Sequence, residues 1–325
     1  MATLRIPAVV PSPAEDCEKL KKSFQDVCCW IIGLGTDEKA LIRILGRRNS
    51  NQRRKIKDTY QQLYNKSLID CIFAELSGDF QKAVMLWAYD PAERDARLAN
   101  EAIKSKKKTV TKLQVIVEIA CANSPHHLVA VRQAYCSLFE SSLEEDIVKH
   151  APLPFQKILV SLVSSYRYDK EVVDCNVANI EATKLHEAIK AKKLDSDEFL
   201  WILSTRNLYQ LRQTFQCYND NYGKSIDKDI MACKDGTRES IMKVVIWCID
   251  SPEKHFAEVI KSAIVGLGTD ENSLTRAIVT RAEIDMMKVR GEYFNCYRTS
   301  LDNAVIGDTS GDYKDFLMTL LGANI

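Results

Sequence analysis

The chain has 325 residues, of which 46% are hydrophobic, and its 45 basic residues nearly balance its 44 acidic ones. This is the composition of an ordinary globular protein, and a formal net charge of +1 argues against a nucleic-acid binder that relies on bulk positive charge. Any attraction to anionic lipid must therefore be local or assisted by a metal ion.

The N-terminal segment carries Arg5 and three prolines before Asp16, so it lacks the uninterrupted apolar stretch of a secretory signal. No apolar run approaches the roughly 20 residues that a membrane-spanning helix requires. The eleven cysteines are odd in number and spread along the chain, which favours a reducing compartment and free thiols. We therefore expect a soluble, cytoplasmic protein.

A string of six residues, Gly-Leu-Gly-Thr-Asp-Glu, occurs at 33–38 and again at 266–271. In both copies a tyrosine follows the second glycine at the same separation, and an apolar residue follows that tyrosine by eight positions. The tyrosine-to-apolar spacing recurs twice between the two copies. The chain therefore contains four related units, anchored at Tyr60, Tyr135, Tyr218 and Tyr293.

The four units define the predicted domain organisation. The second and third tyrosines lie eight positions further apart than the other neighbouring pairs, so the middle connection is longer. The extra length falls within 164–183, which we predict to be a linker or hinge. The predicted repeats are 14–87, 90–163, 173–249 and 252–325.

Each repeat has the pattern of several short helices. Apolar residues recur at helical spacing in segments such as 41–45 and 113–120, and glycine and proline lie mainly between such segments. Strand-like alternation is nearly absent. The sequence therefore predicts an all-α fold.

The repeated string marks a helix start, with Thr36 or Thr269 as the expected N-cap. A cap alone does not explain the two glycines. Glycines on either side of one residue let the backbone turn sharply and leave carbonyl oxygens facing outward. Such carbonyls suit a hard cation, which binds six to eight oxygens including at least one carboxylate.

A distant acid accompanies each glycine pair. Glu75 follows Gly35 by forty positions, and Asp308 follows Gly268 by forty. In the middle repeats the acid position holds His150 and Cys233, and the loop positions hold 108–110 and 191–193, without glycine. Glycines and acid are present together in repeats I and IV and absent together in repeats II and III, which favours metal sites over simple caps.

Four repeats of about seventy residues, each built on a Gly-x-Gly-Thr loop with an acid about forty residues later, resemble the annexin family. The opening Met-Ala-Thr-Leu, the intact loops in repeats I and IV only, and Cys121 and Cys248 at the ends of apolar helices are similar to plant annexins. The resemblance covers nearly the whole chain. It implies a slightly curved all-α disc with five helices per repeat.

The resemblance also implies calcium as the bound ion and calcium-dependent binding to anionic phospholipid membranes, with lipid phosphate or water completing each site. Binding would be peripheral and reversible, by a protein that is monomeric in solution and able to self-associate on membranes. The implied calcium ligands are carbonyls of Ile31, Gly33, Gly35, Ile264, Gly266 and Gly268 and carboxylates of Glu75 and Asp308, with Thr36 and Thr309 as secondary candidates.

The loop tips Leu34 and Leu267 are expected to contact the membrane. Six extra residues precede the first loop, and the sequence leaves open whether they extend a helix or form an apolar bulge. Trp30, within them, either contacts the headgroup zone or packs inward.

Lysines crowd the loops of the middle repeats. They are either solvated helix ends or calcium-independent contacts to anionic lipid. The residues concerned are Lys106, Lys107, Lys108, Lys192 and Lys193.

The expected protein is not an enzyme, because the five histidines lack metal-ligand spacing and no Gly-Lys-Ser/Thr phosphate loop occurs. The alternative is a membrane-associated annexin that conducts ions or has redox, peroxidase-like activity. For redox chemistry, Cys121 and Cys248 are candidates, although free cysteines are commonly buried hydrophobes. A histidine discussed for peroxidase activity is replaced by Gly46.

For conduction, Glu118 and Arg276 match one familiar charge pair, but the arginine expected to pair with Asp95 is Asn123. Ile42-Arg43-Ile44 resembles a short motif suggested for actin contact, which makes actin a weak candidate partner.

Overall fold

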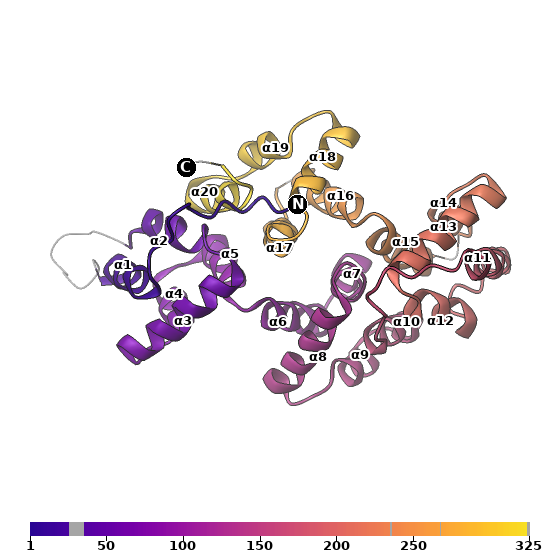
Figure 1. Ribbon diagram of the computed structural model, residues 1–325, viewed down its shortest axis with the longest axis horizontal. Coiled ribbons are helices and arrows are strands. Elements are labelled where there is room, and N and C mark those ends of the chain that lie inside the picture. Colours follow the sequence, from indigo (N-terminus) through magenta and orange to yellow (C-terminus); the bar gives the residue numbers. More distant parts are fainter. Residues whose placement is uncertain (26–35, 235, 267, 324–325) are drawn as a thin grey trace. The chain divides into compact units, whose positions relative to one another are not determined.

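The computed structural model describes residues 1–25, 36–234, 236–266 and 268–323. Helices α1 to α20 account for the regular structure of these residues, and no strand occurs among them (Figure 1). The predicted all-α class is confirmed, as are four repeats of five helices.

The helices follow the same order in every repeat. Repeat I contains α1 (Pro13–Gln25), α2 (Glu38–Leu45), α3 (Ser50–Tyr64), α4 (Leu68–Glu75) and α5 (Gly78–Ala88). Repeat II contains α6 (Pro91–Lys104), α7 (Val110–Cys121), α8 (Pro125–Phe139), α9 (Leu143–His150) and α10 (Leu153–Ser164). Repeat III contains α11 (Cys175–Lys190), α12 (Asp197–Thr205), α13 (Leu208–Tyr222), α14 (Ile226–Ala232) and α15 (Thr237–Asp250). Repeat IV contains α16 (Pro252–Ile264), α17 (Glu271–Arg281), α18 (Met286–Tyr297), α19 (Leu301–Asp308) and α20 (Gly311–Leu320).

The turn between the third and fourth helices is built identically in all four repeats. Each third helix ends at a residue in the left-handed region, five positions after the anchor tyrosine, and this terminates the helix. These residues are Asn65 (φ 49°), Glu140 (φ 53°), Gly223 (φ 68°) and Arg298 (φ 57°). A serine two residues later is the N-cap of each fourth helix: Ser67, Ser142, Ser225 and Ser300.

The four anchor tyrosines are buried. Their contacts explain the constant spacing between each tyrosine and the helix that follows it. The Tyr135 hydroxyl donates to Asp146 (2.6 Å) and the Tyr218 hydroxyl donates to Asp229 (2.9 Å), in each case eleven positions along the chain. Each bond ties the third helix to the fourth. In repeats II and III the tyrosine therefore fixes the position of the fourth helix relative to the third.

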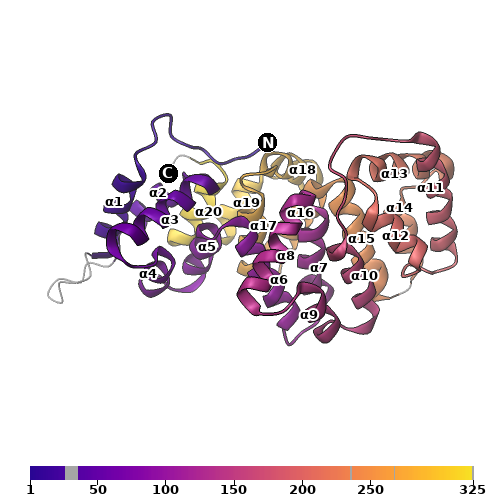
Figure 2. The same ribbon diagram turned by 60° about the horizontal axis from the view of Figure 1, so that its bottom comes forward.

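The chain forms two compact units. The first consists of Met1–Arg94 and Phe256–Ile325, and the second of Asp95–His255. Repeats I and IV, at opposite ends of the sequence, therefore share one unit, as the indigo and yellow ribbons show (Figure 2).

In the first unit, α5 packs against α17 and α20. The fully buried Trp87 of α5 donates from its indole Nε1 to the Leu45 carbonyl (2.7 Å), and the Arg53 guanidinium lies 3.6 Å from its ring centroid. The N-terminal segment joins the same core, because the Thr3 hydroxyl donates to the Leu320 carbonyl (2.7 Å). Repeat I is thus completed by repeat IV.

In the second unit, α7 packs against α15 and α11 packs against α13. The long middle connection lies within this unit and is tied to it: the buried Arg167 donates to the Arg206 carbonyl (2.7 Å). A linker therefore exists at 165–174, but 175–183 belongs to α11, and the units divide elsewhere, at Arg94 and His255. The predicted linker is therefore present, but it is shorter than expected and the boundary between the two units does not lie in it.

No described helix is long and apolar enough to cross a membrane.

Candidate metal sites

The loop between α16 and α17 carries the second copy of the repeated string. Gly266 and Gly268 are exposed and have φ values of +146° and +88°. Side chains other than glycine rarely adopt this backbone region, so both glycines are required by the turn. The Asp270 amide donates to the Ala263 carbonyl (2.8 Å) and closes the loop.

The cap of the following helix is an aspartate, which corrects the expectation that Thr36 or Thr269 would be the N-cap. The Asp37 carboxylate accepts from the Ala40 amide (2.9 Å), and the Asp270 carboxylate accepts from the Ser273 amide (3.1 Å). Aspartate is a strong cap because its carboxylate also favours the positive helix end. The threonine hydroxyl remains available for another role.

In repeat IV this role is to bind the distant acid. The Thr269 hydroxyl lies 2.6 Å from Asp308 Oδ2 and 3.2 Å from the Asp308 carbonyl oxygen, to one of which it donates. Asp308 is the last residue of α19, so the hydroxyl joins the glycine loop to the end of the fourth helix. The sequence spacing predicted that loop and acid would meet. It missed Thr269 as the residue that joins them, although its constant place after the second glycine was a signal.

This arrangement suits a hard cation. Asp308 is half-exposed and lies beside a loop whose backbone is turned by two glycines. Throughout the described ranges, no three His, Cys, Asp or Glu side chains converge as a metal site. A cation here would therefore depend on one carboxylate together with backbone carbonyls, the ligand type that calcium accepts.

Repeat I shows the same frame, with a longer stretch of sequence between its first and second helices. Glu75 is the last residue of α4, as Asp308 is of α19. The segment from the first residue of the first helix to the cap of the second is six positions longer in repeat I (13–37) than in repeat IV (252–270). The Asp37 amide donates to the Ser23 carbonyl (3.2 Å) at the base of the loop.

Part of the predicted first site cannot be placed. Thr36 is buried at the start of α2. The remaining predicted residues of this loop, and one loop tip of repeat IV, lie outside the described residues: Trp30, Ile31, Gly33, Leu34, Gly35 and Leu267.

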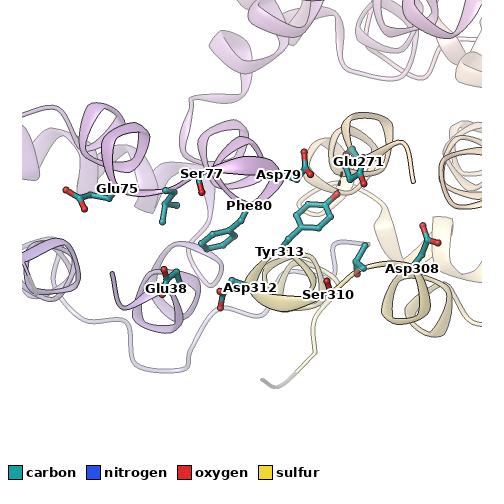
Figure 3. A pocket seen from close by; sticks show the side chains of 12 residues that line it. Glu38, Glu75, Ser77, Asp79, Phe80, Glu271, Asp308, Ser310, Asp312 and Tyr313 are labelled. Atoms are coloured by element: carbon teal, nitrogen blue, oxygen red, sulfur yellow. Dashed lines mark hydrogen bonds between the residues drawn. The ribbon is translucent and has the colours of Figure 1, made fainter. Parts of the chain in front are cut away.

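Glu75 and Asp308 line one cavity of about 450 Å³ in the first unit. Figure 3 shows the two acids on opposite sides, with Phe80 and Tyr313 between them. Six carboxylates line this cavity, and together they lower the electrostatic potential in favour of cations: Glu38, Glu75, Asp79, Glu271, Asp308 and Asp312.

In repeat III the metal position is replaced by a direct bond. Cys233, the counterpart of Asp308, follows the end of α14, and its buried thiol lies 3.3 Å from the Ile189 carbonyl oxygen and 3.4 Å from that of Asp229. Ile189 is the counterpart of Ile264. The side chain at the acid position therefore contacts the loop carbonyl itself.

The loop of repeat III is correspondingly compact. Lys192 is in the left-handed region (φ 55°), and the Lys193 amide donates to the Ala188 carbonyl (2.9 Å). These bonds close the end of α11 in the manner of a Schellman turn.

In repeat II the prediction that the loop lies at 108–110 is wrong, because the loop lies about three residues earlier in the sequence. Val110 is already helical and Thr109 is the N-cap of α7, so the loop is 105–108. His150 ends α9 at the acid position, as predicted. Lys106 and Lys107 are exposed, whereas partial burial lowers the pKa of Lys108. Lys192 and Lys193 in repeat III are also exposed.

The two candidate redox cysteines are both buried in the second unit. Burial raises the pKa of the Cys121 thiol, and the nearby Arg167 only partly opposes this. Neither Cys121 nor Cys248 is part of a disulfide bond.

The similarity of this chain to known proteins extends over almost its whole length. The annexin family model matches residues 16–87, 94–162, 180–245 and 255–320. The chain belongs to the annexin family. Annexins are known for calcium-dependent binding to phospholipid.

Relatives of this annexin include plant proteins and solved structures. It is 59% identical to Annexin D3 of Arabidopsis thaliana over 328 residues, which cover 100% of both chains. The solved structure of annexin III is 31% identical, with a TM-score of 0.89, covering 100% of this chain and 98% of that chain. A structure of calcium-bound annexin (Sm)1 is 28% identical, with a TM-score of 0.84, covering 99% of this chain and 93% of that chain. The resemblance to plant annexins is confirmed.

The two acids considered for conduction, Asp95 and Glu118, each contact a histidine within the second unit. Asp95 lies 2.7 Å from His127 Nε2, so this histidine contacts the carboxylate for which an arginine was expected. Glu118 lies 2.9 Å from the buried His255 Nε2.

Proposed function

We propose that this annexin binds anionic phospholipid membranes when calcium occupies the loops of repeats I and IV. Binding is peripheral and reversible, by a cytoplasmic protein that is a monomer in solution. Each predicted repeat (14–87, 90–163, 173–249 and 252–325) is one module of the family, and two of the four hold calcium.

The observation that carries the proposal is the bond between Thr269 and Asp308 in repeat IV. It holds a carboxylate against a loop whose glycines have positive φ, so carboxylate and carbonyl oxygens are available to one ion. The proposed ligands are the carbonyls of Ile264, Gly266 and Gly268 and the carboxylate of Asp308. Lipid phosphate supplies further oxygens, so calcium and membrane strengthen each other's binding.

Repeat I supplies the second site. Its proposed ligands are the carbonyls of Ile31, Gly33 and Gly35 and the carboxylate of Glu75, with Thr36 as a secondary ligand. In repeat IV the proposed secondary ligand is Thr309, next to Asp308. The Thr309 hydroxyl lies 2.6 Å from the Val305 carbonyl oxygen within its own helix turn, which favours a lesser role for it. Leu34, Leu267 and Trp30 are proposed to contact the membrane.

The exposed lysines of the middle repeats are proposed to add contact that does not need calcium. Each lysine near an anionic surface contributes about 1 kcal/mol, and salt weakens this contribution. Replacing Lys106, Lys107, Lys192 and Lys193 by Gln is expected to abolish the binding that remains without calcium at low salt.

The decisive experiment is co-sedimentation with phosphatidylserine vesicles across a calcium titration. The double variant Glu75→Gln, Asp308→Asn is expected to lose calcium-dependent binding, because each change removes a carboxylate ligand and keeps the side-chain shape. Asp220→Asn is the matched control, since Asp220 is an exposed residue of α13 that contacts Gln216. Normal binding by the double variant would show that the site assignment is wrong.

A further inference from the structure

A large apolar side chain is exposed at the same place in every repeat. It lies in the last turn of the fourth helix, two residues before the position of the acid. The four residues and their exposed fractions are Phe73 (63%), Val148 (55%), Met231 (40%) and Ile306 (48%).

The hydrophobic core does not account for these side chains. In each helix the preceding residue points inward and is fully or almost fully buried: Ile72, Ile147, Ile230 and Val305. The first residue of the same helix, such as Leu68 or Leu301, is buried as well. The apolar residues that these four helices bury are therefore at the first and fifth positions, whereas the sixth position is apolar and exposed.

Four occurrences at one position are not explained by the scattered apolar residues of an ordinary surface. The turn that begins each fourth helix is built identically, so these four side chains occupy equivalent places in their repeats. A requirement shared by all four repeats is a contact made from outside the molecule.

In the first unit the exposed side chains accompany the proposed calcium sites. Phe73 precedes Glu75 and Ile306 precedes Asp308 by two residues, at the end of the same helix. Val265, next to Gly266 in the loop facing Asp308, is also apolar and 60% exposed. A membrane bound through calcium at these acids therefore comes within reach of the apolar side chains.

We propose that the apolar residue in the last turn of each fourth helix enters the boundary between headgroups and acyl chains of an anionic membrane. This inference rests on the proposed calcium-dependent membrane binding and adds a hydrophobic contact to it. The occupant is a bilayer because its phosphates are what the calcium sites bind, and its interface accepts Phe and aliphatic side chains. In repeats II and III, the exposed lysines of the loops supply the attraction to anionic lipid that calcium supplies in repeats I and IV.

The test uses the full chain with Phe73→Ser and Ile306→Ser combined. The matched control combines Leu63→Ser and Phe294→Ser, two apolar residues of the same unit that are each 52% exposed on third helices. At saturating calcium, the partition of the test variant onto phosphatidylserine vesicles is expected to fall about tenfold, because half-exposed apolar area is no longer buried. The control is expected to bind as the unchanged chain does.

A second readout locates the contact directly. Ile306→Trp is expected to add fluorescence that lipids brominated on their acyl chains quench, whereas Phe294→Trp adds fluorescence that they do not quench. Equal circular dichroism and unfolding midpoints for all variants establish that folding is preserved.

The outcomes separate the two proposals. If the unchanged chain does not bind vesicles with calcium, the proposed function fails. If it binds and the test variant binds equally well, or the control falls as far, only the inference is overturned. If the test substitutions instead change the sedimentation coefficient without vesicles and leave partition unchanged, the side chains form a contact between copies of the chain, and the inference is likewise overturned.

Discussion

Thr269 shows how a residue beside a candidate site can position a ligand. Its hydroxyl lies within hydrogen-bond distance of the Asp308 carboxylate while Asp270 caps the helix, so adjacent residues divide two tasks. In repeat IV the string therefore uses its threonine to bond the acid and its aspartate to cap the helix.

Replacing Thr269 by Val is expected to raise the calcium concentration for half-maximal vesicle binding about tenfold. The reason is that a hydrogen bond to a charged group contributes about 1.5–3 kcal/mol and here holds the carboxylate in place. Co-sedimentation measures the shift. Thr280→Val makes the same change in the interior of α17, where the hydroxyl bonds to the Arg276 carbonyl, and is expected to leave the midpoint unchanged. An unchanged midpoint for Thr269→Val would remove the positioning role.

Asp90, at the junction of α5 and α6, predicts a pH-dependent contribution to stability. Partial burial opposes its ionisation, but Arg54 (2.9 Å) and Lys57 (3.2 Å) outweigh burial and lower the pKa of the carboxyl. A lowered folded-state pKa stabilises the protein above the unfolded pKa of about 3.9, and this contribution is lost as pH falls through the folded value.

The variant Asp90→Asn is therefore expected to lower the free energy of unfolding by about 1 kcal/mol at pH 7, in keeping with a partly exposed ion pair. The difference from the unchanged chain is expected to shrink as pH falls below about 4. Urea unfolding at pH 7 and below about pH 4 measures this difference in the free energy of unfolding. A difference that grows on acidification would contradict the assignment.

At the scale of elements, the end of the fourth helix distinguishes the two repeats that are proposed to bind calcium from the two that are not. Repeats I and IV place a half-exposed carboxylate there, whereas repeat III places the buried thiol of Cys233 against the Ile189 carbonyl. Under the proposed assignment, repeat III therefore differs in two ways: it has no carboxylate at this position, and its Ile189 carbonyl already has a partner.

Cys233→Asp is consequently expected to create no calcium site. It should lower the free energy of unfolding by about 2 kcal/mol, because a buried carboxylate would face a carbonyl oxygen. Thermal unfolding with and without calcium tests both statements, with the exposed Cys136→Asp as the control. Calcium-dependent stabilisation of Cys233→Asp beyond that of the unchanged chain would show that the loop can open.

The sequence was sufficient for features that depend on local spacing. The anchor tyrosines predicted the repeats because each tyrosine lies beside the fourth helix, and Glu75, Asp308, His150 and Cys233 all lie at or directly after that helix's end. The loop of repeat II was misplaced because the segment between the loop and Tyr135 is three positions longer than the corresponding segment in repeat IV. The Thr269–Asp308 bond and the thiol–carbonyl contact depend on side-chain directions, which spacing does not determine.

For the molecule as a whole, the main fact is that one unit is continuous in sequence and the other is not. Asp95–His255 is a single segment with its own core, whereas the first unit needs both Met1–Arg94 and Phe256–Ile325. In the first unit α5 of repeat I is covered by α17 and α20 of repeat IV.

A fragment comprising 95–255 is therefore expected to fold by itself and to unfold cooperatively in urea, followed by circular dichroism. A fragment comprising 1–94 is expected to lack cooperative unfolding, because removal of repeat IV exposes the apolar face of α5 to water. Adding a fragment comprising 256–325 should restore it. Cooperative unfolding of 1–94 alone would show that repeat I does not depend on repeat IV.

The discontinuous unit also sets an order of events on the ribosome. Repeat I is synthesised first, but its partner is complete only when the whole of Asp95–His255 and then Phe256–Ile325 have followed it. At translation rates of about 5–20 residues per second, repeat I waits roughly 10 to 50 seconds with its inner face uncovered. During that interval the nascent chain presents a surface for chaperones, so synthesis, and not the finished protein, is the stage at which this annexin is most exposed to aggregation.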